Sequence, residues 1–257
     1  MMLGDHNNKM DGMVAIVTGA SRGLGRAIAK EFAAEGAKVV VSARRSSPTG
    51  LPGTAMETAE QIRSQGGEAM ALTCDVSDEE QVTAMVGQTI DTYGRIDVLV
   101  NNAGVMVLGE TILDIVPEEW DLSVASNLRG PYLCCRAVLP TMIEQGRGSI
   151  IHIGSRMGSD HGEGGGVLYS STKAAVHMFS LCLADEVREH NIAVNILSPG
   201  ALKTEGSAAI PWTQRDWAQR VGPEAVGPSA VYLALQDAST FTGQLVHRVE
   251  FGDTWGT

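Results

Sequence analysis

The chain has 257 residues, 44% of them hydrophobic and 19% charged, which is enough to bury one substantial core. Its formal net charge of −11 argues against a surface that follows the phosphates of a nucleic acid, so we expect no nucleic-acid partner. No segment approaches the roughly 20 apolar residues that cross a bilayer, and residues 1–11 lack the apolar run of a signal peptide. We therefore expect a cytoplasmic protein without a membrane partner.

Apolar, β-rich runs alternate with amphipathic stretches through the first part of the chain. In chain order the pattern predicts a strand at Val14–Val17, a helix over Gly23–Glu35, a strand at Val39–Val41, a helix from Thr54 toward Gln65, a strand at Ala69–Thr73 and a helix from Ser77 to about Tyr93. Thr54 with Glu57, and Ser77 with Glu80, have the capping-box spacing. We expect these two pairs to open their helices.

The rest of the chain continues the alternation. In chain order it predicts a strand at Val98–Val100, a mostly helical region from Trp120 to Gln145, a strand at Ile150–Ile153, a helix from about Leu168 to His190, and strands at Ala193–Leu197 and Leu245–Val249. Pro117 suits the first turn of a helix, where its missing N–H is not needed.

Short apolar strands separated by helices are what a parallel sheet buried on both faces requires. We therefore expect an α/β fold: a doubly wound parallel sheet of about seven strands in three layers, αβα. The chain shows no internal repeat and no linker between domains. We expect one domain over residues 12–257, preceded by a flexible N-terminal segment at residues 1–11.

The turn after the first predicted strand is rich in glycine and reads Thr18-Gly19-Ala20-Ser21-Arg22-Gly23-Leu24-Gly25. Such glycines let backbone N–H groups and the N-terminus of the next helix approach a pyrophosphate closely. The alternative is a tight strand-to-helix turn without a ligand. The position of the segment directly after the first strand favours a dinucleotide site.

The residues after the second predicted strand carry positive charge. NAD-specific sites usually place an acid there, because its carboxylate accepts hydrogen bonds from the ribose hydroxyls. Here that position is Ala43, and Arg44 and Arg45 follow it. Arg22 lies in the glycine-rich turn, so a 2′-phosphate would meet cations. We expect NADP(H) to be preferred over NAD(H), the alternative being that Arg44 and Arg45 are solvated at the start of a loop.

The glycine spacing GxxxGxG differs from the general GxGxxG fingerprint and resembles the TGxxxGxG of short-chain dehydrogenases/reductases (SDR). Asp75-Val76 resembles the family's adenine-contacting pair, and Asn101-Asn102-Ala103-Gly104 resembles its NNAG segment. With Pro199-Gly200 followed by Thr204, the resemblance implies a single-domain Rossmann-type fold that binds both dinucleotide and substrate. The expected cofactor-binding residues are Gly19, Ser21, Arg22, Gly23, Leu24, Gly25, Arg44, Asp75, Val76, Asn102, Ala103, Gly104, Tyr169, Lys173, Pro199, Gly200 and Thr204.

Four polar residues resemble the family's catalytic Asn-Ser-Tyr-Lys tetrad. Tyr169 and Lys173 are four residues apart on a predicted helix, so both side chains emerge on one face. Ser155 lies 14 residues before Tyr169, and Asn127 lies in the long helical region. The separation of Ser155 from Tyr169 is one residue longer than is usual in the family, and Ser159 is the less favoured alternative to Ser155.

The resemblance implies hydride transfer from the nicotinamide to a carbonyl carbon, with Tyr169 giving a proton to the oxygen. Lowering a phenol pKa from near 10 toward 7 requires about 4 kcal/mol, part of which Lys173 is placed to supply. By resemblance Lys173 also holds the nicotinamide ribose, Ser155 orients the carbonyl oxygen, and Asn127 positions a water that connects Lys173 to solvent.

We expect an NADP(H)-dependent oxidoreductase that interconverts a small-molecule ketone or aldehyde and an alcohol and, by resemblance, forms a homodimer or homotetramer. One alternative is a 3-oxoacyl-[acyl-carrier-protein] reductase. Asp185 stands where such enzymes use a basic residue, which disfavours this reading, whereas Arg129, Arg136 and Arg147 could supply another basic patch. A second alternative is a catalytically silent NADP(H)-binding sensor or scaffold, which has no need for a phenol beside an ammonium.

Two further residues follow Ser155 in a glycine-rich loop. Arg156 or His161 could contact a polar or carboxylate-bearing ketone, the alternative being that both face solvent. No group of histidine, cysteine and acidic residues has the spacing of a metal site, so we expect no metal. The four cysteines form no CxxC pair, and we expect reduced thiols.

Overall fold

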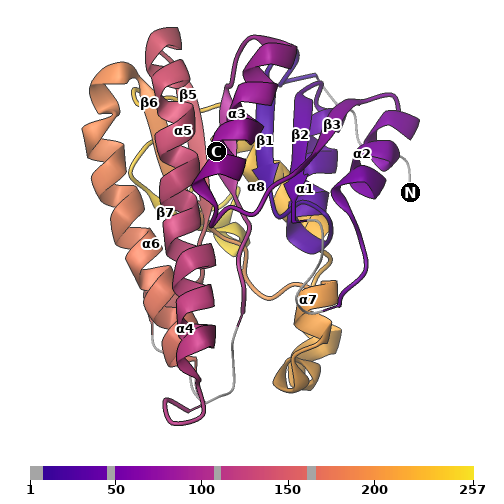
Figure 1. The fold of residues 1–257 in the computed structure, drawn as a ribbon, viewed down its shortest axis with the longest axis vertical. Coiled ribbons are helices and arrows are strands. Elements are labelled where there is room, and N and C mark those ends of the chain that lie inside the picture. Colours follow the sequence, from indigo (N-terminus) through magenta and orange to yellow (C-terminus); the bar gives the residue numbers. More distant parts are fainter. Residues whose placement is uncertain (1–7, 45–49, 107–110, 161–165) are drawn as a thin grey trace.

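Seven parallel strands form one sheet in the described part of the chain, residues 8–44, 50–106, 111–160 and 166–257 of a computed structural model (Figure 1). The strand order β3-β2-β1-β4-β5-β6-β7 places β1 where the winding reverses direction. The strands are β1 (Val14–Thr18), β2 (Lys38–Ala43), β3 (Glu68–Thr73), β4 (Val98–Asn101), β5 (Gly148–Ile153), β6 (Ile192–Ser198) and β7 (Leu245–His247). The predicted doubly wound parallel sheet is therefore confirmed.

The two faces of the sheet bury different side chains, because successive residues of a strand point to opposite sides. In β1, Val17 packs in the cluster that contains Phe32, and Ile16 packs in the cluster that contains Met85. Helices α1, α2 and α8 cover the first face, and α3, α5 and α6 cover the second, which makes the three expected layers. The helices are α1 (Gly23–Ala34), α2 (Ala55–Ser64), α3 (Glu79–Tyr93), α4 (Pro117–Val124), α5 (Gly130–Gln145), α6 (Val167–Glu186), α7 (Glu205–Ala208) and α8 (Gly227–Ala234).

The first predicted capping box is confirmed and the second is wrong. Thr54 caps α2 by accepting from the N–H of Glu57, and the Glu57 carboxylate accepts from the N–H of Thr54. At α3 the cap is Asp78, whose carboxylate accepts from the N–H groups of Glu80 and Gln81, two and three positions later. A carboxylate at a helix N-terminus gains from the helix dipole as well as from the hydrogen bonds, so it displaces the neighbouring hydroxyl.

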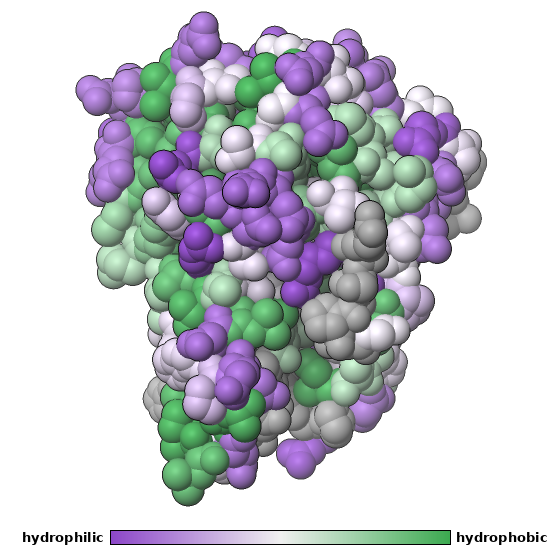
Figure 2. Space-filling model, viewed as in Figure 1, coloured by the Kyte–Doolittle hydropathy of each residue, from purple (hydrophilic) through white to green (hydrophobic). Residues whose placement is uncertain are grey.

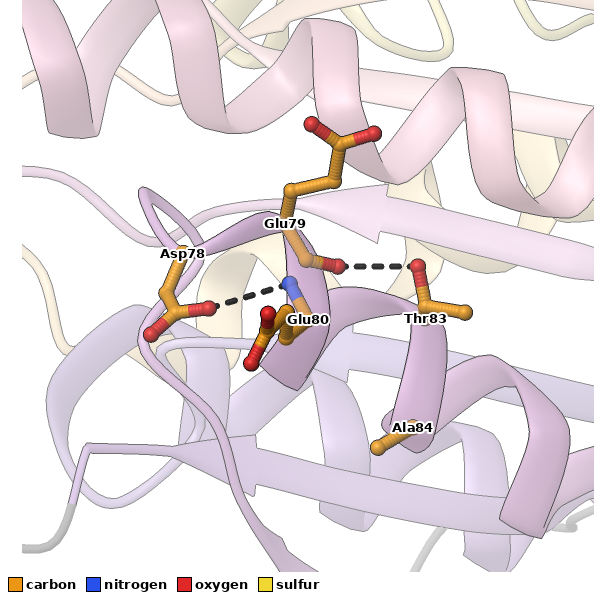
Figure 3. A pocket seen from close by; sticks show the side chains of 5 residues that line it. All are labelled: Asp78, Glu79, Glu80, Thr83 and Ala84. Carbon is orange, nitrogen blue, oxygen red and sulfur yellow. Dashed lines mark hydrogen bonds between the residues drawn. The ribbon is translucent and has the colours of Figure 1, made fainter.

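A surface pocket opens at this start of α3, and acidic side chains line much of it (Figure 3). Asp78 is engaged as the helix cap, and hydrogen bonds from Gln81 lower the pKa of its carboxyl. Glu79 pairs with Arg136 of α5. The carboxylates of Asp78 and Glu79 therefore have structural partners, and the pocket gives no reason to place the reaction there.

The long helical region after Pro117 contains a wider turn that the sequence pattern did not predict. Pro117 is the first residue of α4, as expected. Between α4 and α5, residues Ala125–Arg129 form the π-helical turn η1. Segments of 3₁₀ helix lie at η2 (Arg156–Gly158), η3 (Arg188–His190), η4 (Pro211–Gln219), η5 (Pro223–Val226) and η6 (Arg248–Glu250).

Residues Lys9 and Met10 are attached to the end of α1. The N–H of Met10 donates to the carbonyl oxygen of Glu35 at 2.9 Å, the N–H of Lys9 donates to the Glu35 carboxylate, and the Met10 side chain is fully buried. Part of the expected flexible segment is thus packed against the domain, and residues 1–7 lie outside the described residues.

The lower left tip of the molecule in Figure 2 is hydrophobic, where the segment that leads into α4 lies. Ile112 is 60% exposed and Leu113 92% exposed. No helix among the described residues is long and apolar enough to cross a membrane.

Candidate active site

The predicted site residues gather where the strands end. The segments that follow the carboxyl ends of β1, β4, β5 and β6 carry the glycine-rich turn, the Asn102 segment, Ser155 and Pro199-Gly200. Parallel strands bring these segments to one edge of the sheet, and in open α/β sheets ligands bind there, at the point where the strand order reverses. The fold therefore brings together residues that are far apart in the sequence.

The glycines of the first turn are required by the neighbouring segment. At Gly19, whose φ is +65°, a Cβ would lie 2.7 Å from the Cα of Ala103. At Gly25 it would lie 2.5 Å from the amide nitrogen of Asn102. That amide nitrogen donates to the carbonyl oxygens of Thr18 and Gly19 at 2.9 and 3.1 Å. Asn102 thus shapes the turn through its side chain, a structural role that the resemblance alone did not predict.

The Thr18 hydroxyl has a structural role that sequence reasoning missed. Its oxygen accepts from the N–H groups of Asn102 and Ala103 at 3.0 and 3.1 Å, and its O–H donates to the carbonyl oxygen of Val100. These atoms are at least partly buried and need partners. The Thr18 hydroxyl therefore supplies hydrogen bonds where the backbone pairing between β1 and β4 ends. The signal in the sequence is the threonine that directly precedes Gly19.

A carboxylate of the chain itself lies at the N-terminus of α1. The N–H of Gly23, the first residue of the helix, donates to Oε2 of Glu205 at 3.0 Å. Arg26 of the same helix lies 3.4 Å from the other carboxylate oxygen. Helix N-termini attract anions through free N–H groups and the helix dipole. Sequence reasoning missed Glu205, which begins α7 directly after Thr204.

Two of the arginines predicted to bind the 2′-phosphate have partners within the protein. Arg22 donates to the carbonyl oxygens of Pro52 and Gly53 at 2.7 and 3.2 Å. Arg44 lies 3.9 Å from the carboxylate of Asp75. Arg45 lies outside the described residues.

The remaining expected dinucleotide contacts are ordered parts of the same edge. Val76 is buried, Gly200 has a φ of +77°, and Thr204 caps α7 with its side chain. The carbonyl oxygen of Pro199 accepts from Nε of Arg248 at 2.9 Å. This bond fixes the position of the segment after β6 relative to η6.

Tyr169 and Lys173 emerge on the same face of α6, as the spacing predicted. Nζ of Lys173 lies 5.6 Å from the centre of the Tyr169 ring and donates to the carbonyl oxygen of Ile153 at 2.7 Å. Burial lowers the pKa of Lys173 to about 8. Lys173 thus connects α6 to the end of β5, where Ser155 follows.

The pKa of Tyr169 differs from the sequence expectation. Burial raises it to about 12, and a hydrogen bond with the side chain of Ser155 acts in the opposite direction. Lys173 lies over the ring face and donates a hydrogen bond to Ile153. It therefore does not offset the rise in the Tyr169 pKa that burial causes. The surrounding protein therefore keeps Tyr169 protonated at neutral pH, in the form that donates.

Ser155, and not Ser159, faces Tyr169. The Ser155 hydroxyl oxygen accepts from the N–H of Met157 at 3.2 Å, which leaves its O–H to donate. The Ser159 hydroxyl donates instead to the carbonyl oxygen of Arg156 at 3.2 Å, on an exposed turn. The longer spacing to Tyr169 falls partly on residues 161–165, which lie outside the described residues.

Asn127 lies in the π-helical turn and is almost fully buried. Its Oδ1 accepts from the N–H of Val105 at 2.7 Å, and its Nδ2 donates to the Val105 carbonyl oxygen and to the Thr172 hydroxyl. A Cβ at Gly104 would lie 2.9 Å from Oδ1. Asn127 therefore joins the segment after β4 to α6. Its contact on α6 is Thr172, the residue before Lys173.

Of the two residues predicted to contact substrate, Arg156 and His161, the structure describes only Arg156. Arg156 is exposed and lies 3.8 Å from the carboxylate of Glu250. His161 lies outside the described residues. The geometry thus gives Arg156 an ion pair on the surface, which is worth little in water.

The chain is similar to known proteins in both sequence and structure. The family model described as short chain dehydrogenase matches residues 13–214. The chain is 39% identical over 192 residues to a 3-oxoacyl-[acyl-carrier-protein] reductase of Synechocystis sp., covering 75% of each. It is 37% identical over 198 residues to elsinochrome reductase 1 of Elsinoe fawcettii, covering 77% of this chain and 71% of the relative. A metagenomic short-chain oxidoreductase in complex with NADP has a similar structure, with a TM-score of 0.76, 34% identity, and coverage of 93% of this chain and 98% of that one.

Proposed function

Because this chain belongs to the short chain dehydrogenase family, we propose that it is an NADP(H)-dependent oxidoreductase that interconverts a ketone or aldehyde and an alcohol, with Tyr169 as general acid and base. The observation that carries the proposal is the hydrogen bond between Ser155 and Tyr169 beside the buried Lys173. Two hydroxyl groups that face one another can both donate to one substrate oxygen. A binding module has no need for such a pair.

The residues divide the reduction between them. A dinucleotide held at this edge would supply the hydride for the carbonyl carbon. Tyr169 gives its proton to the carbonyl oxygen, and the Ser155 hydroxyl donates a second hydrogen bond to the same atom. The Met157 N–H occupies a lone pair of Ser155, which favours donation over acceptance. Lys173 holds the end of β5 and, in this proposal, the nicotinamide ribose, while Asn127 maintains the turn beside it.

The dinucleotide fits the edge that holds the glycine-rich turn. The N–H of Gly23 at the start of α1 donates to the carboxylate of Glu205, which supports an anion site at this position. We assign the pyrophosphate to this position, the adenine to Asp75 and Val76, and the 2′-phosphate to Arg44 with Arg22. The preference for NADP(H) is supported by the absence of an acid at Ala43 and by one similar structure that contains NADP.

A 3-oxoacyl-[acyl-carrier-protein] reductase is the second candidate, since one relative at 39% identity has that name. The surface argues against it. Asp185 is exposed and pairs with Arg188, and Arg136 of the possible basic patch is paired with Glu79. An acidic carrier protein would meet carboxylates and neutralised arginines at these positions.

The test is oxidation of NADPH, followed at its absorbance band, across a panel of aromatic ketones, aliphatic ketones, aldehydes and a 3-oxoacyl thioester. We expect turnover with at least one small carbonyl compound and its loss in Tyr169→Phe. Turnover restricted to the thioester would favour the second candidate. Tight NADPH binding without turnover on any member would favour the silent sensor. The cytosolic location and the homodimer or homotetramer stay predictions of the sequence.

A further inference from the structure

His177 lies one helical turn after Lys173 on α6, and its ring is buried behind the segment that carries Ser155. Nε2 of His177 accepts from the backbone N–H of Ser155 at 3.4 Å. Neither the sequence motifs nor the mechanism above uses this residue.

The ring fills the space that two glycines leave open. A Cβ at Gly154 would lie 2.7 Å from Nε2 of His177, and a Cβ at Gly158 would lie 2.7 Å from its Cε1. Gly154 precedes Ser155, and Gly158 ends the η2 turn that follows it. The imidazole therefore contacts both ends of the short segment that presents the Ser155 hydroxyl.

The protonation state of His177 suits an acceptor. Burial, the positive charge of Lys173 and the nearby His247 lower the pKa of His177 to about 4. Its ring is therefore neutral near pH 7, with Nε2 free to accept and the proton on Nδ1.

With this bond, three polar atoms of Ser155 have partners within the protein. Its N–H donates to His177, its carbonyl oxygen accepts from the N–H of Gly158 at 3.0 Å, and its hydroxyl oxygen accepts from the N–H of Met157. The hydroxyl proton of Ser155 is left to donate toward Tyr169 and, in the proposed reaction, the substrate oxygen. Loss of the first bond would leave a half-buried N–H without a partner, and the segment would shift to reach water.

We propose that His177 is a positioning residue, which fixes the backbone of Ser155 so that its hydroxyl faces Tyr169 and the substrate oxygen. This proposal rests on the proposed function, because it concerns the same reaction. It adds a residue that acts through Ser155 and does not itself touch substrate or dinucleotide.

The test compares three variants of His177. His177→Gln places an amide oxygen near the position of Nε2, whereas His177→Asn has the same chemistry but a shorter reach, and His177→Leu has no acceptor. We expect kcat to fall roughly 10-fold in the Asn and Leu variants, and to stay within about 2-fold of wild type in the Gln variant. The Kd for NADPH, measured by fluorescence, should change less than about 2-fold in all three. His190→Leu, on the exposed η3 turn, is the matched control and should leave kcat unchanged.

A double-mutant cycle with Ser155→Ala shows whether His177 acts through Ser155. We expect Ser155→Ala alone to lower kcat roughly 100-fold, and His177→Asn to cause less than about a 2-fold further loss in that background. Equal losses in both backgrounds would overturn the proposal, as would wild-type kcat in the Asn variant or equal loss in the Gln and Asn variants. If wild type itself turns over no carbonyl compound, the proposed function fails instead, and the two failures are distinguished.

Discussion

The two ends of the site differ in how the chain satisfies its own polar groups. At the chemical end, Lys173, Ser155 and Asn127 bond to backbone atoms of the protein and need no rearrangement to act. At the dinucleotide end, the carboxylate of Glu205 lies against the N–H of Gly23, where the pyrophosphate is proposed to bind. The chemical end is preorganised, whereas the proposed dinucleotide site would exchange an internal anion for its ligand.

Because of this difference, substitutions at the two ends should affect different quantities, the turnover rate and the affinity for the dinucleotide. Substitutions of Tyr169 or Ser155 at the chemical end should change turnover while NADPH binding is kept, because Lys173, which holds the ribose in this proposal, stays in place. Substitutions at the dinucleotide end should change binding, in either direction, because an internal contact competes with the ligand. The following predictions test that separation, from the largest expected effect to the smallest.

Tyr169→Phe should give the largest effect, confined to turnover. It removes the proton donor and keeps the ring beside Lys173, so we expect kcat to fall about 1000-fold or more with the Kd for NADPH within about 2-fold of wild type. Steady-state kinetics and fluorescence titration measure the two quantities. A comparable loss of NADPH affinity would show that the two ends are not separable.

Lys173 provides a pH-dependent test of the chemical end. Its pKa in the folded protein is about 8, below the ordinary value of 10.5, so the unfolded chain keeps this proton to a higher pH. Folding therefore gains stability as pH rises between the two values. From about pH 7 to about pH 9.5, we expect the free energy of unfolding of wild type to rise by roughly 2 kcal/mol relative to Lys173→Met. Chemical denaturation of both proteins at each pH measures the change, and a constant difference would mean that the ammonium is well solvated.

Arg44→Ala tests the cation assigned to the 2′-phosphate. A hydrogen bond between two charged groups is lost only for the phosphorylated cofactor, so we expect NADPH to bind roughly 10-fold more weakly and NADH to change less than about 2-fold. Titration with both dinucleotides provides its own control. Equal weakening would show that Arg44 supports the site without contacting the phosphate.

Glu205→Gln tests the internal anion and should have the smallest effect, with the opposite sign. Removing the carboxylate's negative charge lessens competition with the pyrophosphate, which both dinucleotides contain. We expect NADPH and NADH each to bind about 3- to 10-fold more tightly. Glu60→Gln, an exposed change on α2, is the matched control. Weaker binding in Glu205→Gln would show that this carboxylate supports the site instead of competing for it.

The sequence predicted the sheet well because its central strands are short, apolar and buried on both faces. Tyr169 and Lys173 were also predictable, since helical spacing alone puts them on one face. Glu205 was not, because its contact with Gly23 joins residues 182 positions apart and depends on where α7 lies. Burial raises the pKa of Tyr169 in the protein without dinucleotide, an effect that the spacing of Tyr169 and Lys173 could not predict, because spacing shows a neighbouring charge but not the depth of burial.

The π-helical turn at Ala125–Arg129 has a consequence for tolerance to change. Such a turn amounts to one extra residue inside an α-helix, and each residue of a helix advances its face by about 100°. Deleting a single residue there would restore a regular helix but rotate α4 against α5. Either Asn127 would lose its place between Val105 and Thr172, or the apolar stripe of α5 would leave the sheet. This stretch should therefore accept substitutions of its outward side chains far more readily than any change in its length.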